Sequence, residues 1–111
     1  MISGLPDDAL VIAPENFGPI AAITPFSTAQ EAYLRANAGD LGLSAYVFTR
    51  DAGRIREAVA SLESGMIGVN SLALAAAEAP FGGVKYSGMG REGGSEAIHD
   101  YLNVKLAQIT L

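Results

Sequence analysis

Apolar runs alternate with amphipathic segments between residues 19 and 70, and this alternation constrains the fold more than any other feature of the sequence. Three short, mostly apolar runs have the length of buried strands: 20–23, 44–49 and 66–70. The segment between the last two runs places apolar residues at helical spacing, at Ile55, Ala58, Val59 and Leu62. The order strand, helix, strand, helix, strand predicts an α/β fold, a parallel sheet with flanking helices.

Local signals predict where the two helices begin and end. Ser27 is followed three residues later by Gln30, so Ser27 is the expected N-cap of the first helix. Asp51 is the expected start of the second helix. Gly65 is expected to end that helix as its C′ residue.

The chain after Asn70 has a less regular pattern. Residues 71–79 are mostly Ala and Leu and fit either a helix or an extended apolar loop. Residues 95–102 predict a short helix, with His99 on its surface or at an interface. Residues 103–111 alternate as a strand with only a partly polar face, which makes this segment a candidate for pairing with another chain.

Composition excludes several classes of function. There is no cysteine and only one histidine, so a thiolate nucleophile, a disulfide and a cysteine or histidine metal cluster are all excluded. The net charge of -5 and the scattered basic residues argue against nucleic-acid binding. No apolar run reaches the roughly 18 residues of a membrane span, and the first residues do not resemble a signal peptide. We therefore expect a cytoplasmic protein without a membrane partner.

The chain is short and unusually apolar. Its 111 residues allow one domain with a modest core. Half of the residues are hydrophobic, only 17% are charged, and the mean hydropathy is +0.27. Because a free-standing domain needs a wet surface, we expect another protein surface to cover part of this apolar area.

The stretch PFGGVKYSGMGREGG, residues 80–94, contains a formal G-x-G-x-x-G match at Gly88, Gly90 and Gly93. A dinucleotide cradle of this kind needs a preceding strand, a following helix and an acidic residue about 20 positions later. Here Lys85-Tyr86-Ser87 precede Gly88, and the chain ends before a second strand. The pattern therefore predicts a close-packed surface loop in which glycines permit positive φ and close backbone approach.

Four segments together resemble the NAD(P)-dependent aldehyde dehydrogenase superfamily. Residues 80–92 resemble its P-F-G-G-x-K-x-S-G-x-G-R-E motif. Three further segments follow the order of that family, namely ENFGP at 15–19, GLSAYVFT at 42–49 and GMIGVN at 65–70. The likeness runs from about Pro6 to the last residue. It implies the C-terminal part of the catalytic domain at residues 1–102, and an oligomerisation strand at residues 103–111.

The resemblance also implies binding residues. In the family, the glutamate of E-x-F-G-P hydrogen-bonds the nicotinamide ribose of NAD or NADP and the phenylalanine packs near the nicotinamide, which assigns those roles to Glu15 and Phe17. Phe81 would lie at the mouth of the aldehyde tunnel. The variable substrate loop would comprise Ala73, Leu74 and Ala75. Residues 76–80 and the overall texture of the chain are most similar to semialdehyde dehydrogenase relatives. However, succinic-semialdehyde members have a serine where Ala75 stands, so the resemblance does not favour that substrate.

The catalytic machinery of the family has no counterpart in these 111 residues. Its nucleophilic cysteine, its general-base glutamate and its Rossmann domain all precede E-x-F-G-P. We therefore expect no catalytic or metal-binding residue here, and neither aldehyde oxidation nor tight NAD(P) binding by this chain alone. The expected partners are further copies of the chain or a missing N-terminal half, with an aldehyde as substrate of the complete enzyme. The alternative is a non-catalytic, self-associating interaction module that retains the fold.

Overall fold

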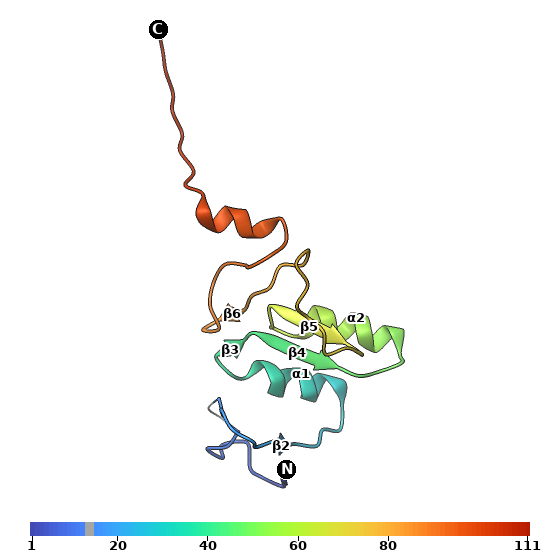
Figure 1. Ribbon diagram of the computed structural model, residues 1–111. Coiled ribbons are helices and arrows are strands. Elements are labelled where there is room, and N and C mark those ends of the chain that lie inside the picture. The colour runs from blue at the N-terminus through green and yellow to red at the C-terminus, as the bar shows by residue number, and fades with distance from the viewer. Residues whose placement is uncertain (13–14) are drawn as a thin grey trace.

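The computed structural model describes residues 1–12 and 15–111 (Figure 1). The elements follow in this order: β1 (Ile2–Ser3), β2 (Ala22–Ile23), α1 (Ala29–Asn37), β3 (Leu41–Gly42), β4 (Ser44–Val47), α2 (Ala52–Ser61), β5 (Met66–Val69), β6 (Val84–Lys85) and the 3-10 helix η1 (Glu96–Tyr101). The mixed α/β class expected from the sequence is confirmed.

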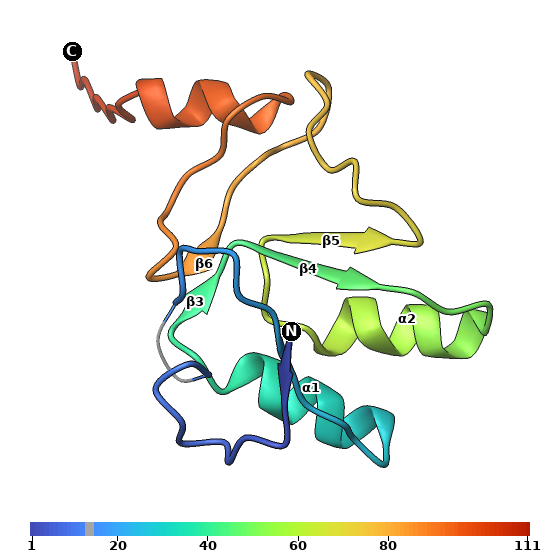
Figure 2. The ribbon, with the colours of Figure 1, turned by 60° about the horizontal axis from the view of Figure 1, so that its bottom comes forward.

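The centre of the fold is a βαβ unit. Strands β4 and β5 pair in parallel, with Ser44 opposite Met66 and Val47 opposite Val69, and α2 connects them. Helices α1 and α2 lie on the same side of this strand pair (Figure 2). Met66 of β5 and Ala58 of α2 form the buried apolar core of the described residues. Parallel pairing and flanking helices therefore agree with the prediction.

The predicted strand at 20–23 does not join that pair. Its observed part, β2, pairs in parallel with β1 instead, and the pairs β1–β2 and β4–β5 are separate two-stranded sheets. A third pair, β3 with β6, is antiparallel and brings the glycine-rich stretch to the start of β4. The sequence pattern did not predict this pairing, because two-residue strands carry no measurable periodicity.

Two of the three predicted helix signals were wrong by a few residues. Thr28, not Ser27, caps α1, because its hydroxyl accepts the Glu31 N–H at 3.1 Å. Helix α2 ends at Ser61, so Gly65 is not its C′ residue. Gly65 instead lies where the backbone of Gly82 approaches it too closely for any side chain.

The third signal, Asp51 as the N-cap of α2, is confirmed. Its carboxylate accepts the Arg54 N–H at 3.0 Å and the Gly53 N–H at 2.7 Å. These two hydrogen bonds hold the pKa of Asp51 below its ordinary value of 3.8. The charged cap therefore stabilises the fold fully at pH values above 3.8, and this contribution is lost as the pH falls through the lowered pKa of Asp51.

We expect Asp51→Ala to reduce the helix content and the urea stability of the chain at neutral pH, whereas Asp51→Asn, which keeps an acceptor oxygen, should retain most of both. The difference between wild type and Asp51→Ala should shrink as the pH is lowered below 3.8. Circular dichroism during urea titrations at several pH values measures both effects. An equal loss at every pH would show that the charged cap is not the cause.

The C-terminal segment of the chain projects away from the rest of the molecule. After η1, residues 103–111 extend away from all other elements, which gives the molecule its 72 Å length (Figure 1). Val104, Leu106 and Ile109 are exposed, and this segment makes no hydrogen bond to the described residues. Its role as an oligomerisation strand stays a prediction. Residues 71–79, which fitted either helix or loop, form neither helix nor strand.

Membrane-spanning helices are absent from the described ranges, since none of their helices has the length and apolar character that a bilayer requires.

Candidate functional site

The glycine-rich stretch, which contains β6, folds back on itself. Phe81 and Glu92 exchange two backbone hydrogen bonds, each 2.7 Å long. Between them, the Arg91 guanidinium donates to the carbonyl oxygens of Gly83 at 2.8 Å and Gly90 at 2.6 Å. We call residues 81–92 the glycine hairpin. Its two ends are fixed relative to each other by hydrogen bonds that do not depend on any ligand.

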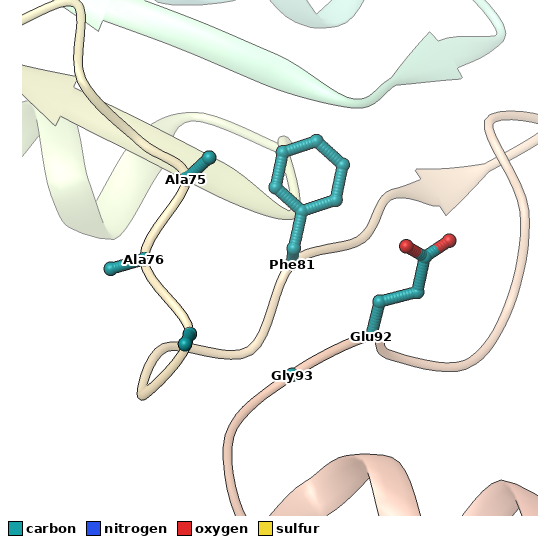
Figure 3. Close-up of a pocket in the computed structure, with 6 residues that line it drawn as sticks. Ala75, Ala76, Phe81, Glu92 and Gly93 are labelled. Carbon is teal, nitrogen blue, oxygen red and sulfur yellow. The ribbon is translucent and has the colours of Figure 1, made fainter.

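An open pocket of about 440 Å³ lies against this hairpin. Its wall consists of small or apolar residues and one carboxylate: Ala75, Ala76, Ala77, Phe81, Glu92 and Gly93. The Phe81 ring faces Ala75, and the Glu92 side chain stands beside the ring (Figure 3). The volume suits a small organic molecule, with an apolar contact on one side and a negative charge at the edge.

A second set of contacts attaches the hairpin to the helices. The Lys85 ammonium donates to the carbonyl oxygens of Asn37 at 2.7 Å and Gly39 at 3.0 Å, just after α1, and forms an ion pair with Glu63 at 2.8 Å. The cation thus satisfies carbonyls that the helix end leaves without partners. Lys85 has a φ of 56° and Tyr86 N–H donates to Asp40 O, so the backbone turns sharply here.

The glycines adopt the close-packed loop that the sequence predicted. Gly88 and Gly90 have positive φ, whereas the glycines at 82 and 83 lie where a side chain would collide with neighbouring atoms. The residues after Gly94 form only the short 3-10 helix η1. The stretch therefore lacks the strand-to-helix geometry on which dinucleotide cradles depend.

The pocket brings together two of the residues that the sequence placed at a substrate site, Ala75 and Phe81. Ala73 does not line the pocket, and Leu74 lies near Gly68 of β5 instead. Glu15 and Phe17 are exposed and also lie outside this pocket, with Phe17 93% exposed. A cofactor held by Glu15 and Phe17 would therefore need further contacts from another protein surface.

The residue pattern alone gave no role to Lys85, Arg91 or Glu92, although all three lie in the quoted motif. Their partners are backbone carbonyls and amides more than five residues away in most cases, and such contacts have no periodic signature. One signal could have pointed to Lys85 and Arg91: a basic residue inside a glycine-rich stretch, where backbone carbonyls without partners are common, can donate to those carbonyls. Within residues 1–12 and 15–111, His, Asp and Glu form no cluster suited to a metal ion.

The parallel βαβ unit defines the class of fold: part of an α/β domain, with an open pocket at the glycine hairpin. The model described as the aldehyde dehydrogenase family matches residues 1–107. The chain therefore belongs to the aldehyde dehydrogenase family, as the four quoted segments predicted.

Individual relatives support the same assignment. A succinate-semialdehyde dehydrogenase of Paenarthrobacter nicotinovorans is 46% identical over 101 residues, covering 91% of this chain and 22% of that enzyme. A betaine aldehyde dehydrogenase of Cereibacter sphaeroides is 50% identical over 99 residues, covering 88% of this chain and 20% of that enzyme. The NAD+ complex of an aldehyde dehydrogenase from Bacillus cereus superposes with a TM-score of 0.87 at 38% identity, covering 93% of this chain and 21% of that chain.

The chain thus spans about one fifth of the length of the curated relatives that it matches. This coverage agrees with the expectation that the chain corresponds to a fragment of such an enzyme.

Proposed function

We propose that this chain forms the C-terminal part of an NAD(P)-dependent aldehyde dehydrogenase, which converts an aldehyde to a carboxylic acid. It supplies a nicotinamide-ribose contact at Glu15 and Phe17, a substrate wall at Ala75 and Phe81, and a subunit contact at residues 103–111. The observation that carries the proposal is the family match over residues 1–107 together with the pocket in which Phe81 faces Ala75.

The donor set fits the proposed cofactor contact. The Glu15 carboxylate is exposed and forms no ion pair with the described residues, so both of its oxygens are available to ribose hydroxyl donors. The exposed Phe17 ring offers a flat apolar face that would restrict a nicotinamide. When bound, the nicotinamide would supply the hydride acceptor. The residues of this chain would position it. The thiolate nucleophile belongs to the rest of the enzyme because the chain has no cysteine, and the family resemblance also places the general base there.

The residues that line the Phe81 pocket also indicate which kind of aldehyde the site would accept. The wall contains alanines, an aromatic ring and the Glu92 carboxylate, and no cationic side chain. Such a wall gives no attraction to a substrate carboxylate, in agreement with Ala75 replacing a serine. An uncharged or cationic aldehyde therefore suits this wall better than succinic semialdehyde does.

A chimeric enzyme tests the proposal. In it, this chain replaces the matching segment of the Cereibacter sphaeroides betaine aldehyde dehydrogenase, and betaine aldehyde is oxidised with NAD or NADP while reduced cofactor is followed by absorbance. We expect turnover within about tenfold of the parent enzyme, and none from the 111 residues alone. A correctly folded chimera without activity would overturn the proposal.

The same chimera tests the cofactor contact. Glu15→Gln should raise the KM for the cofactor about tenfold, the effect of weakening charge-assisted hydrogen bonds, with little change in the KM for the aldehyde. Asp8→Asn, a matched neutralisation of an exposed acid without an ion pair to the described residues, is the control. Equal cofactor KM values for both variants would remove Glu15 from the site.

A second candidate, a non-catalytic self-associating module, is favoured by one observation, the exposed apolar segment 103–111. An inactive chimera together with a chain that forms a discrete oligomer would select this alternative.

A further inference from the structure

The short helix η1 is tied to the glycine hairpin by one carboxylate. Asp100 Oδ2 accepts the backbone N–H of Arg91 at 2.7 Å. Gly90 makes room for this contact, since a Cβ at Gly90 would lie 2.6 Å from the same oxygen. Gly90 also has a φ of 89°, a backbone conformation that favours glycine. The Asp100 carboxylate therefore accepts the Arg91 N–H in a space that exists only because residue 90 has no side chain.

The Arg91 amide that Asp100 holds lies next to the pocket wall. The following residue, Glu92, exchanges two backbone hydrogen bonds with Phe81, and both line the pocket (Figure 3). The Arg91 guanidinium extends to Gly83 O on the other arm of the hairpin. A continuous set of hydrogen bonds thus leads from Asp100 through Arg91 to both arms of the hairpin that carries Phe81.

Asp100 itself does not touch the pocket. It is exposed, it is absent from the pocket wall, and Arg91 N–H is its hydrogen-bond donor. It lines a neighbouring pocket of about 260 Å³ that shares Phe81 and Glu92 with the first pocket, so Asp100 lies next to the Phe81 pocket but not in its wall. What the carboxylate does is fix the direction of the chain at Arg91, immediately before Glu92.

We propose that Asp100 is a positioning residue for the wall of the Phe81 pocket, acting through the Arg91 amide on the Phe81–Glu92 pair. The inference rests on the proposed function, because it takes this pocket as the aldehyde site. Asp100 lies two residues before Leu102, after which the proposed subunit strand begins. The pocket wall and the subunit contact are consequently joined by a single short helix.

Hydrogen exchange tests the structural half of the inference on the full 111-residue chain. In the wild type, we expect the Phe81 and Glu92 amides to be protected. Asp100→Ala should speed their exchange about tenfold, the effect of losing one hydrogen bond to a charged acceptor, while Asp100→Asn restores most of the protection. His99→Ala, on the same helix, is the control. Unprotected amides in the wild type, or equal exchange in wild type and Asp100→Ala, would overturn the inference.

Kinetics in the chimera test the functional half. Asp100→Ala should raise the KM for the aldehyde about fivefold to tenfold and leave kcat and the cofactor KM within about twofold, since a misplaced wall weakens only substrate binding. Asp100→Asn should behave as wild type. A fall in kcat together with a rise in the KM for both the aldehyde and the cofactor would show that Asp100 has a merely structural role. If the parent chimera is inactive, the proposed function fails, whereas the exchange result still decides whether Asp100 orders the hairpin.

Discussion

Replacing Gly65 with alanine should prevent the chain from holding its fold, the largest effect that we expect from any single methyl group. A Cβ at this position would lie 2.1 Å from the carbonyl oxygen of Gly82 and 2.8 Å from Gly83 Cα. Both contacts are with backbone, which has no rotamer that relieves them. Overpacking of this kind costs about 3 kcal/mol, and the buried core of Ala58 and Met66 offers little to offset it.

The collision also explains why the effect should reach the site. Gly82 follows Phe81 directly, so any shift of its carbonyl moves the pocket wall. In the chimera, we expect Gly65→Ala to abolish turnover and to lower the yield of folded enzyme, measured by activity and by circular dichroism. Gly39→Ala is the matched control, since no atom lies within 4 Å of its Cβ position and its φ is not positive. A normally folded, active Gly65→Ala enzyme would contradict the observed packing of Gly65 on Gly82.

Deleting residues 103–111 should abolish self-association. The segment carries exposed apolar side chains and backbone groups without partners in the described chain, which is the condition under which an extended segment pairs with another copy. Size-exclusion chromatography with light scattering should show a dimer or larger species for the full chain and a monomer for the truncated one. A substitution of Leu72, which is also an exposed apolar residue but lies outside the segment, by Asp should leave the mass unchanged.

The outcome of that experiment also bears on the cofactor. Adding a large excess of NAD should not shift either mass, because the isolated chain offers only the exposed Glu15 and Phe17. A truncated chain that keeps the mass of the full chain would remove the subunit role from residues 103–111. A clear shift with NAD would contradict the expectation that this chain does not hold the cofactor alone.

The sequence determined the family and the local elements. The alternation of apolar runs predicted β4, α2 and β5, and Asp51 was correctly identified as a cap, because both signals depend on residues close in the chain. The quoted motifs predicted membership of the aldehyde dehydrogenase family, which the match over residues 1–107 confirms.

Contacts between distant segments were decided by the tertiary structure alone. The packing of Gly65 on Gly82 and the attachment of Lys85 to the end of α1 both join residues far apart in sequence. The link from Asp100 to Arg91 spans nine residues and depends on the positive φ of Gly90. Each contact has a backbone group on at least one side. Because backbone groups are the same in every residue, the side-chain pattern could not predict where these contacts form.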